Sequence, residues 1–234
     1  MKIIVLIIAA FITIVKVNAQ TFQQSYTYST TVIRAFHQGH EGDFNCASIA
    51  LIKCAIATFG SDNVFKAVTK ENDVYKITLR NGETVILSKQ ELDTATARNG
   101  FKLDDNQNML NQANLIYAVM AKRAVTFCIS NTTFGLCTNL DSALMFLHGE
   151  TGGVDARRLP ILLGLARVKV RHKKELSYIY ENGYHAVFAS KKVWDNYGSP
   201  DRLSLRYWRI HIGPNPIKDL ESINFKLVDL SDLK

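Results

Sequence analysis

The sequence predicts an α+β protein in which helices dominate the first part of the fold and strands the last. An almost wholly apolar run follows Cys46, which is typical of a buried helix. Apolar and polar residues alternate on both sides of Asn81-Gly82, which is the pattern of a β-hairpin. After Gly153 the character of the chain changes to short, strand-like runs. These runs are Leu162–Val170, Tyr184–Ser190 and Leu205–Ile212.

Residues 1–19 have the parts of a secretory signal peptide. Met1-Lys2 forms a short basic region, Ile3–Val15 is apolar, and Val17-Asn18-Ala19 supplies small residues for cleavage. The alternative is an uncleaved membrane anchor, but the apolar run is short for a span of about 20 residues. We therefore expect a mature chain that begins near Gln20, is secreted or periplasmic, and has no membrane association after cleavage.

Residues 20–234 are enough for one large domain or two small lobes, and we expect a monomer. The chain has 28 basic against 21 acidic residues, and only two of the basic ones lie in the signal segment, so the rest is mildly basic. The one dense basic cluster, Arg167–Lys174, alternates like a strand. A solvated strand edge is favoured there over a patch for nucleic acid or another anionic polymer. No nucleic-acid partner is expected.

The helical part contains one buried helix and three others. Within Ala47–Phe59 only Ser48, Lys53 and Thr58 are polar, and Gly60 suits the position after the helix end. The three others follow from a capping box and from apolar patterning. They are Ser88 to about Arg98, Asn111–Arg123 and Asp141–His148.

Four cysteines in an exported protein raise the question of disulfides. Cys128 and Cys137 are nine residues apart in a polar loop, where a bridge and two free thiols are both plausible. Cys54 lies among apolar helix residues and is expected to be a buried free thiol. Cys46 and Cys54 are eight residues apart on one helix, too far in rise to bond each other. Cys46 is therefore expected to be free.

A free thiol at a helix start has the position of a catalytic nucleophile. The helix N-terminus favours the thiolate, and an imidazole then completes the ion pair and protonates the leaving group. Among six histidines, His185 opens a strand-like run, and Asp195 and Asn196 follow in a turn from which either could orient the imidazole. The alternatives stay open: a packing cysteine at Cys46, a structural histidine at 185, and a simple turn residue at Asp195.

Five segments resemble the calpain branch of the papain-like cysteine peptidases, and they occur in that family's order. QGHEGDFNC, residues 38–46, resembles the Gln-Gly-x-x-Gly-Asp-Cys opening. LNQANLIYAVMAKRA resembles a helix of the type L-x-x-A-Y-A-K-L, and SALMFLHGETGG resembles the A-L-x-G-G-x-T…T-G-G segment. NGYHAVFAS resembles the G-H-A-Y-x-V strand, and VWDNYG lies where the family has R-N-P-W-G. The resemblance covers Phe36 to Gly198.

The resemblance implies a papain-like fold with the active site between a helical lobe, about 36–150, and a β-rich lobe, about 151–234. It implies Cys46 as the nucleophile and His185 as the base. It places Asp195 where the family has asparagine, with Asn196 one position off. Gln38 matches the oxyanion glutamine but lies eight residues before Cys46 instead of six, because Phe44-Asn45 is inserted.

The expected activity is that of a secreted thiol endopeptidase acting on a protein or peptide substrate. Gly152 and Gly153 would leave room for an extended substrate, or would be turn glycines. No metal or organic cofactor is expected, and the calcium of the calpain branch is not carried over because no comparable acidic loop is present. The alternatives are another Cys–His acyl-transfer enzyme, such as a cell-wall amidase or transglutaminase, and a catalytically inactive relative.

Strand alternation also predicts how the third catalytic position is presented. If the strand after Ser190 returns beside Tyr184–Ser190, Trp194 is expected to point into the core. Asp195 would then face the opposite side, toward the cleft, and Asn196 would share the face of Trp194.

Overall fold

The computed structural model describes residues 28–39, 44–130, 137–150, 155–167, 177–181, 185–190, 193–202, 208–210 and 212–214. The expected α+β class is confirmed, since helices occur together with several antiparallel sheets. The expected signal peptide at residues 1–19 and the expected substrate glycines Gly152 and Gly153 lie outside the described residues. Among the residues that are described, no helix has the length and apolar character needed to cross a membrane.

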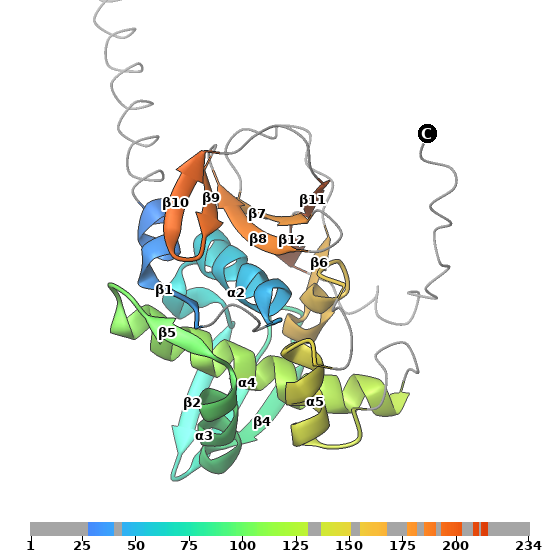
Figure 1. Ribbon diagram of the computed structural model, residues 1–234. Helices are drawn as coiled ribbons and strands as arrows, with labels where there is room; N and C mark the ends of the chain where they lie inside the picture. Colours follow the sequence, from blue (N-terminus) through green and yellow to red (C-terminus); the bar gives the residue numbers. More distant parts are fainter. Residues whose placement is uncertain are drawn as a thin grey trace, which may run out of the picture.

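Helix α2, Cys46–Phe59, occupies the centre of the molecule (Figure 1). Every side chain from Ala47 to Ile56 is buried, as expected for a helix that is apolar nearly all round. The helix packs against strands β7, Ser177–Glu181, and β8, Ala186–Ser190, and also contacts helix α4, Gln107–Ser130. Cys46, the first residue of α2, therefore lies on a helix that neighbouring elements hold on more than one side.

The five-stranded sheet covers one side of α2 with the strand order β10-β9-β8-β7-β11, and all neighbouring strands are antiparallel. Its remaining strands are β9, Val193–Asn196, β10, Ser199–Arg202, and β11, Trp208–Ile210. The expected return of the chain beside β8 is confirmed, because Ala189 pairs with Trp194 and Ser190 with Val193.

The expected orientation of Trp194 is wrong. Along β9, Val193 and Asp195 are buried, whereas Trp194 and Asn196 are half-buried. Val193 belongs to the main core, and Trp194 instead packs on a small cluster formed by Tyr178, Tyr180, Val187 and Ala189. The sheet thus carries apolar side chains on both faces, so an aromatic residue does not identify the face that meets α2. Asp195 is on the face opposite Trp194, as expected, but that face is the one turned to the core.

The helical part also contains a three-stranded antiparallel sheet around the expected hairpin. Its strands are β2, Ala67–Glu71, β3, Val74–Thr78, and β4, Thr84–Ser88. The expected capping box at the start of helix α3, Lys89–Arg98, is confirmed: Ser88 Oγ accepts from the Glu91 N–H at 3.1 Å, and Glu91 Oε2 accepts from the Ser88 N–H at 2.8 Å. Helix α5, Leu140–Leu147, agrees with its predicted span within one residue at each end. Helix α4 is longer than predicted at both ends.

The remaining elements connect these parts. A helix over residues 28–35 leads into β1, Phe36–Gln38, which pairs with β5, Phe101–Leu103. Part of the predicted strand Leu162–Val170 is the 3₁₀ helix η3, Leu159–Leu163, followed by β6, Leu165–Arg167. The last two elements are η1, Ser61–Asn63, and β12, Ile212–Pro214, which pairs with β6. One hydrophobic core includes side chains from Val32 to Val193, so both predicted lobes contribute to it.

Candidate active site

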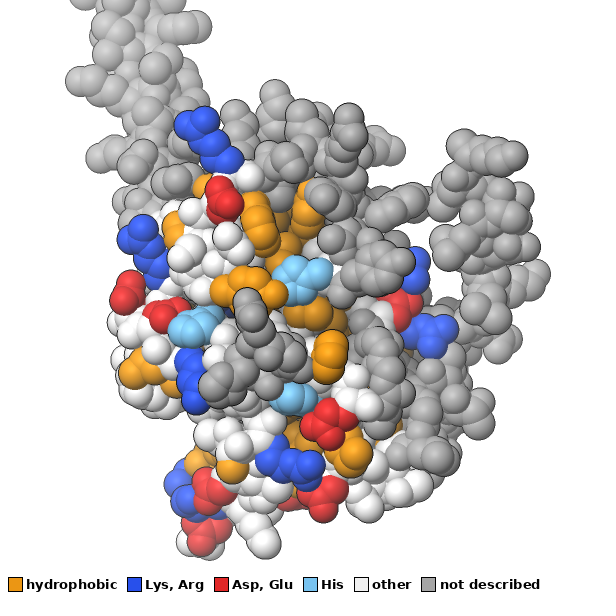
Figure 2. Space-filling view, in the orientation of Figure 1, with side chains coloured by type: hydrophobic (Ala, Val, Ile, Leu, Met, Phe, Trp, Pro, Cys, Tyr) orange, Lys and Arg blue, Asp and Glu red, His pale blue; other side chains and the backbone are white. Residues whose placement is uncertain are grey.

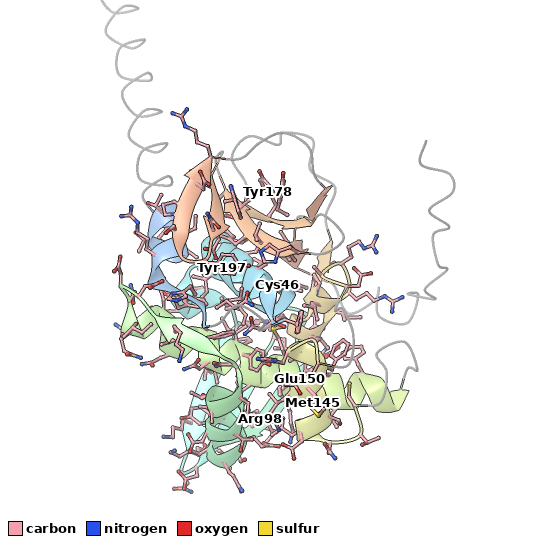
Figure 3. All side chains as sticks on the ribbon, in the orientation of Figure 1. Cys46, Arg98, Met145, Glu150, Tyr178 and Tyr197 are labelled. Carbon is pink, nitrogen blue, oxygen red and sulfur yellow. The ribbon has the colours of Figure 1, made fainter. Side chains whose placement is uncertain are left out.

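Cys46 is the first residue of α2, and its side chain is half-buried with a free thiol. The first turn of the helix contains no acidic residue, and the preceding Asn45 provides no side-chain cap. The first N–H groups of a helix have no partner within the helix and form its positive end, so a negative charge is favoured at this place. Figure 3 shows Cys46 at the start of α2, with Tyr197 above it and Met145 and Glu150 below it in this view.

Phe44 and Asn45, the two residues before Cys46, differ in exposure. Asn45 is fully buried, and its Nδ2 donates to the Asn99 carbonyl oxygen at 2.5 Å. Phe44 is 66% exposed. The predicted oxyanion donor Gln38 ends β1, is buried, and pairs with Phe101 of β5. Residues 40–43, which join these two stretches, lie outside the described part.

His185 directly precedes β8, the strand that packs against α2. Its ring stacks on the ring of Tyr197, with centroids 5.7 Å apart and planes inclined by 23°. Burial lowers the pKa of His185 below its ordinary value, and the negative charge of Asp195 acts in the opposite direction. The larger influence is burial, so a neutral imidazole, the form of a general base, is favoured in the absence of a neighbouring thiolate.

Asp195 is buried and both of its carboxylate oxygens are engaged. Oδ2 lies 2.6 Å from Nζ of Lys53, and Oδ1 accepts from the Gly198 N–H at 2.8 Å. Lys53 belongs to α2, so the ion pair joins the helix that begins at Cys46 to the strand next to β8. A carboxylate has about four lone-pair sites, so Asp195 retains capacity to accept from an imidazole N–H. Asn196 is half-buried on the other face of β9.

The turn between β9 and β10 carries Tyr197 next to His185. Both turn residues have positive φ, 48° at Tyr197 and 88° at Gly198, as in a two-residue hairpin turn of type I′. This conformation is unusual for a bulky residue such as Tyr197, whose side chain is 53% exposed. On its other side the turn approaches the His37–Asp104 pair, in which Nδ1 and Oδ2 are 2.7 Å apart.

We expect Gly198→Ala to lower the free energy of unfolding by about 1–3 kcal/mol, the usual cost of a residue held in a disfavoured conformation. The new Cβ would lie 2.7 Å from Asp104 Oδ2 and 3.2 Å from His37 Cβ, at a backbone conformation that L residues rarely adopt. Urea unfolding measures the change. Ser199→Ala, at the exposed neighbouring position, is the control and should shift stability by less than about 0.5 kcal/mol. Equal midpoints for the two variants would contradict this description of the turn.

His148 lies close to the start of α2. Ser48 Oγ, in the first turn, donates to the Leu147 carbonyl oxygen at 2.8 Å. A Cβ added to Gly149 would lie 2.6 Å from Phe44 Cβ. The two neighbours of His148, Leu147 and Gly149, thus both lie against residues within two positions of Cys46. Nδ1 of His148 is 3.4 Å from Oε1 of Glu150. On the face seen in Figure 2, histidine side chains gather with exposed hydrophobic ones.

The other cysteines are engaged or buried. Cys137 is disulfide-bonded, whereas Cys46 and Cys54 are free. This is compatible with the predicted bridge, although the side chain of Cys128 lies outside the described part. Cys54 is fully buried, and burial raises the pKa of its thiol to about 12, so it is inert as a nucleophile. Within the ranges that the structure covers, no group of three or more His, Cys, Asp and Glu side chains is arranged to hold a metal ion.

In comparisons with known proteins, no protein-family model, curated protein or solved structure matches this chain.

Sequence reasoning missed Lys53, Tyr197 and the two histidine–carboxylate pairs near the site. In the sequence, Lys53 is one of three polar residues in an apolar helix. A lysine in the middle of a buried helix requires a partner, since an unpaired buried charge is costly. That requirement was the available signal, but its partner lies 142 residues away and could not be located from the sequence.

Proposed function

We propose that this chain is a cysteine-type endopeptidase with a papain-like, calpain-related active site. The observation that carries the proposal is the placement of three groups around α2. Cys46 begins this buried helix, Asp195 is ion-paired with Lys53 of the same helix, and the charge of Asp195 acts on His185. A thiol, an imidazole and a carboxylate from distant parts of the sequence are thus associated with one rigid element.

The proposed reaction begins with proton transfer from the Cys46 thiol to His185. The Sγ atom attacks the peptide carbonyl carbon, and the developing oxyanion accepts from the Cys46 backbone N–H and from the Gln38 amide. His185 returns the proton to the amine as the C–N bond breaks, which leaves a thioester on Cys46. Water then attacks the thioester with His185 as base, releases the acid product, and restores the thiol.

Asp195 is the proposed third member, and Asn196 is the alternative. Asp195 is favoured by its charge effect on His185 and by its position on the buried side of β9, whereas Asn196 lies on the opposite face. An orienting group fixes the imidazole without reacting itself. Tyr197, stacked on His185, restricts the ring from a second direction.

The proposed substrate is an extended segment of a protein or peptide. Exposed apolar side chains occur at Phe44, two residues before Cys46, at Met145 on α5, and at Tyr197. Such side chains suit contact with apolar substrate residues on both sides of the nucleophile. We propose that the enzyme acts as a secreted or periplasmic monomer, without metal or organic cofactor, and that Gly152 and Gly153 contact the substrate backbone.

The test combines a thiol-directed epoxide probe with a peptide library. The proposal predicts that the probe labels Cys46, that Cys46→Ala abolishes the label, and that the wild-type protein cleaves internal peptide bonds. Labelling without peptide cleavage, together with release of cell-wall fragments or amide exchange on glutamine, would assign the site to an amidase or transglutaminase instead. An unlabelled Cys46 in the folded protein would identify an inactive relative and overturn the proposal.

A further inference from the structure

Lys53 is the most deeply buried charged side chain of the site. It has no exposed surface and lies two helical turns after Cys46. Its Nζ donates to Asp195 Oδ2 at 2.6 Å and to the Ile33 carbonyl oxygen at 2.8 Å, and it lies 4.9 Å from the centre of the Phe36 ring. These contacts join α2 to β9, to the helix over residues 28–35 and to β1. A lysine buried in this way is costly unless its N–H groups are satisfied.

The position of Lys53 relative to Cys46 follows from helix geometry. Seven residues correspond to almost two full turns, so the two side chains leave α2 on the same side, about 10 Å apart along the axis. Asp195 meets this side of the helix at Lys53, and His185 lies within range of the charge of Asp195. The ion pair therefore fixes the distance between the helix that carries the nucleophile and the strand that carries the orienting carboxylate.

Asp195 is also held from within its own hairpin. Its Oδ1 accepts from the Gly198 N–H, and its Oδ2 is paired with Lys53 Nζ. With two defined donors on two oxygens, the plane of the carboxylate is fixed. A carboxylate with a fixed plane offers its remaining lone pairs in fixed directions, which is what an orienting group requires.

We propose that Lys53 is a positioning residue, which holds Asp195 in the orientation that fixes the ring of His185 opposite Cys46. The proposal rests on the proposed function. It goes beyond it by giving a buried helix residue, far from the substrate, a role in turnover. Lys53 contacts neither substrate nor reacting atoms and acts only through Asp195.

A further ion pair lies near Lys53. Asp104, which follows β5, contributes to the electrostatic environment of Lys53 and is itself paired with His37 of β1. The charged and titratable groups described at this part of the site include Lys53 on α2, Asp195 on β9, His185 before β8, and the His37–Asp104 pair. Of these groups, only Lys53 belongs to the helix that begins at Cys46 and also contacts a carboxylate oxygen of Asp195.

The experiment compares wild type with Lys53→Met by two readouts. Steady-state kinetics on a peptide substrate should give a kcat at least about tenfold lower with KM within about threefold, because orientation is lost and substrate contacts are not. Long-range ¹H–¹⁵N spectra of the imidazoles are recorded in the Cys46→Ala background, where no thiolate charges the ring, and are assigned with His185→Asn. They should show one neutral tautomer of His185 when Lys53 is present and both tautomers in Lys53→Met. A lysine with a purely packing role would leave the tautomer unchanged.

Two further variants complete the test. Lys122→Met removes the half-exposed lysine that pairs with Glu91, and it should leave both readouts as in wild type. Lys53→Gln keeps an N–H donor without the charge, and it replaces Lys53→Met in both measurements if Lys53→Met does not fold. The expected result for Lys53→Gln is again a kcat at least about tenfold lower and two tautomers.

The proposal is overturned if a folded Lys53 variant keeps kcat within twofold and a single His185 tautomer. Loss of folding in both variants would also overturn it, because Lys53 would then be a stability residue alone. The tautomer readout does not depend on turnover. An inactive wild type with a Lys53-dependent His185 tautomer would therefore refute the proposed function while leaving the positioning role intact.

Discussion

Cys46→Ala is expected to lower kcat/KM on a peptide substrate by at least about a thousandfold, because it removes the atom that forms the covalent intermediate. The half-buried side chain at the start of α2 is small, so the change should alter the free energy of unfolding by less than about 1 kcal/mol. Steady-state kinetics and urea unfolding of the same preparation measure the two quantities.

Cys54→Ala is the matched control, since it makes the same substitution two turns further along the same helix. Cys54 is fully buried and burial raises the pKa of its thiol to about 12, so its loss should cost some stability but leave kcat/KM within about twofold. A Cys46→Ala protein that keeps a tenth or more of the wild-type activity would refute Cys46 as the nucleophile.

Asp195→Ala is expected to have the second largest effect, and to affect both stability and turnover. Removal of the carboxylate leaves Lys53 fully buried without its counter-charge, and breaking a buried ion pair in this way costs about 3–5 kcal/mol. Loss of an orienting group should also lower kcat by about ten- to a thousandfold, which corresponds to about 2–4 kcal/mol, with KM nearly unchanged. Urea unfolding and steady-state kinetics measure these effects.

Asn196→Ala provides the comparison on the neighbouring position. Asn196 is half-buried on the opposite face of β9, so its loss should cost less than about 1 kcal/mol of stability and less than about tenfold in kcat. If Asn196→Ala proves the more damaging variant for turnover, Asn196 is the orienting residue and Asp195 serves the fold alone.

The buried helix and the hairpin were predictable because their signals are local. The apolar run after Cys46 has no polar face, so it can form only a buried helix, and Asn81-Gly82 with alternating flanks specifies a hairpin. The capping box at Ser88 is equally local, since both of its hydrogen bonds join residues three apart. Each of these features is decided within about fifteen residues of sequence, and each agrees with the structure.

The environment of Asp195 was not predictable because it depends on tertiary contacts. From the sequence, Asp195 had two separate interpretations, an orienting carboxylate or a turn residue. The structure gives it a turn hydrogen bond to Gly198 and, in addition, an ion pair with Lys53 that neither interpretation included. The predicted orientation of Trp194 was wrong for a related reason. Alternation along β9 separates two faces but does not say which one meets α2, and here both are apolar.

His185 and His148 differ in what surrounds them, and the sequence favoured His185 through its strand and its downstream carboxylate. The structure adds that His185 stacks on Tyr197 and experiences the charge of Asp195, whereas His148 is close to Glu150. Because His148 lies close to the helix start and His185 directly precedes a strand that packs against the same helix, the choice of base must be tested with both.

The most direct test of the central claim is the rate of Cys46 alkylation by iodoacetamide as a function of pH, followed by mass spectrometry of the Cys46 peptide. Burial lowers the pKa of His185, so an ion pair can form there only if the thiolate stabilises the charged imidazole. The account predicts that alkylation of Cys46 stays fast at about pH 6, where an ordinary thiol with a pKa of about 8.5 is almost fully protonated and reacts slowly. His185→Ala should abolish this low-pH reactivity, whereas His148→Ala should retain it. Superimposable profiles for wild type and His185→Ala would contradict the pairing of Cys46 with His185.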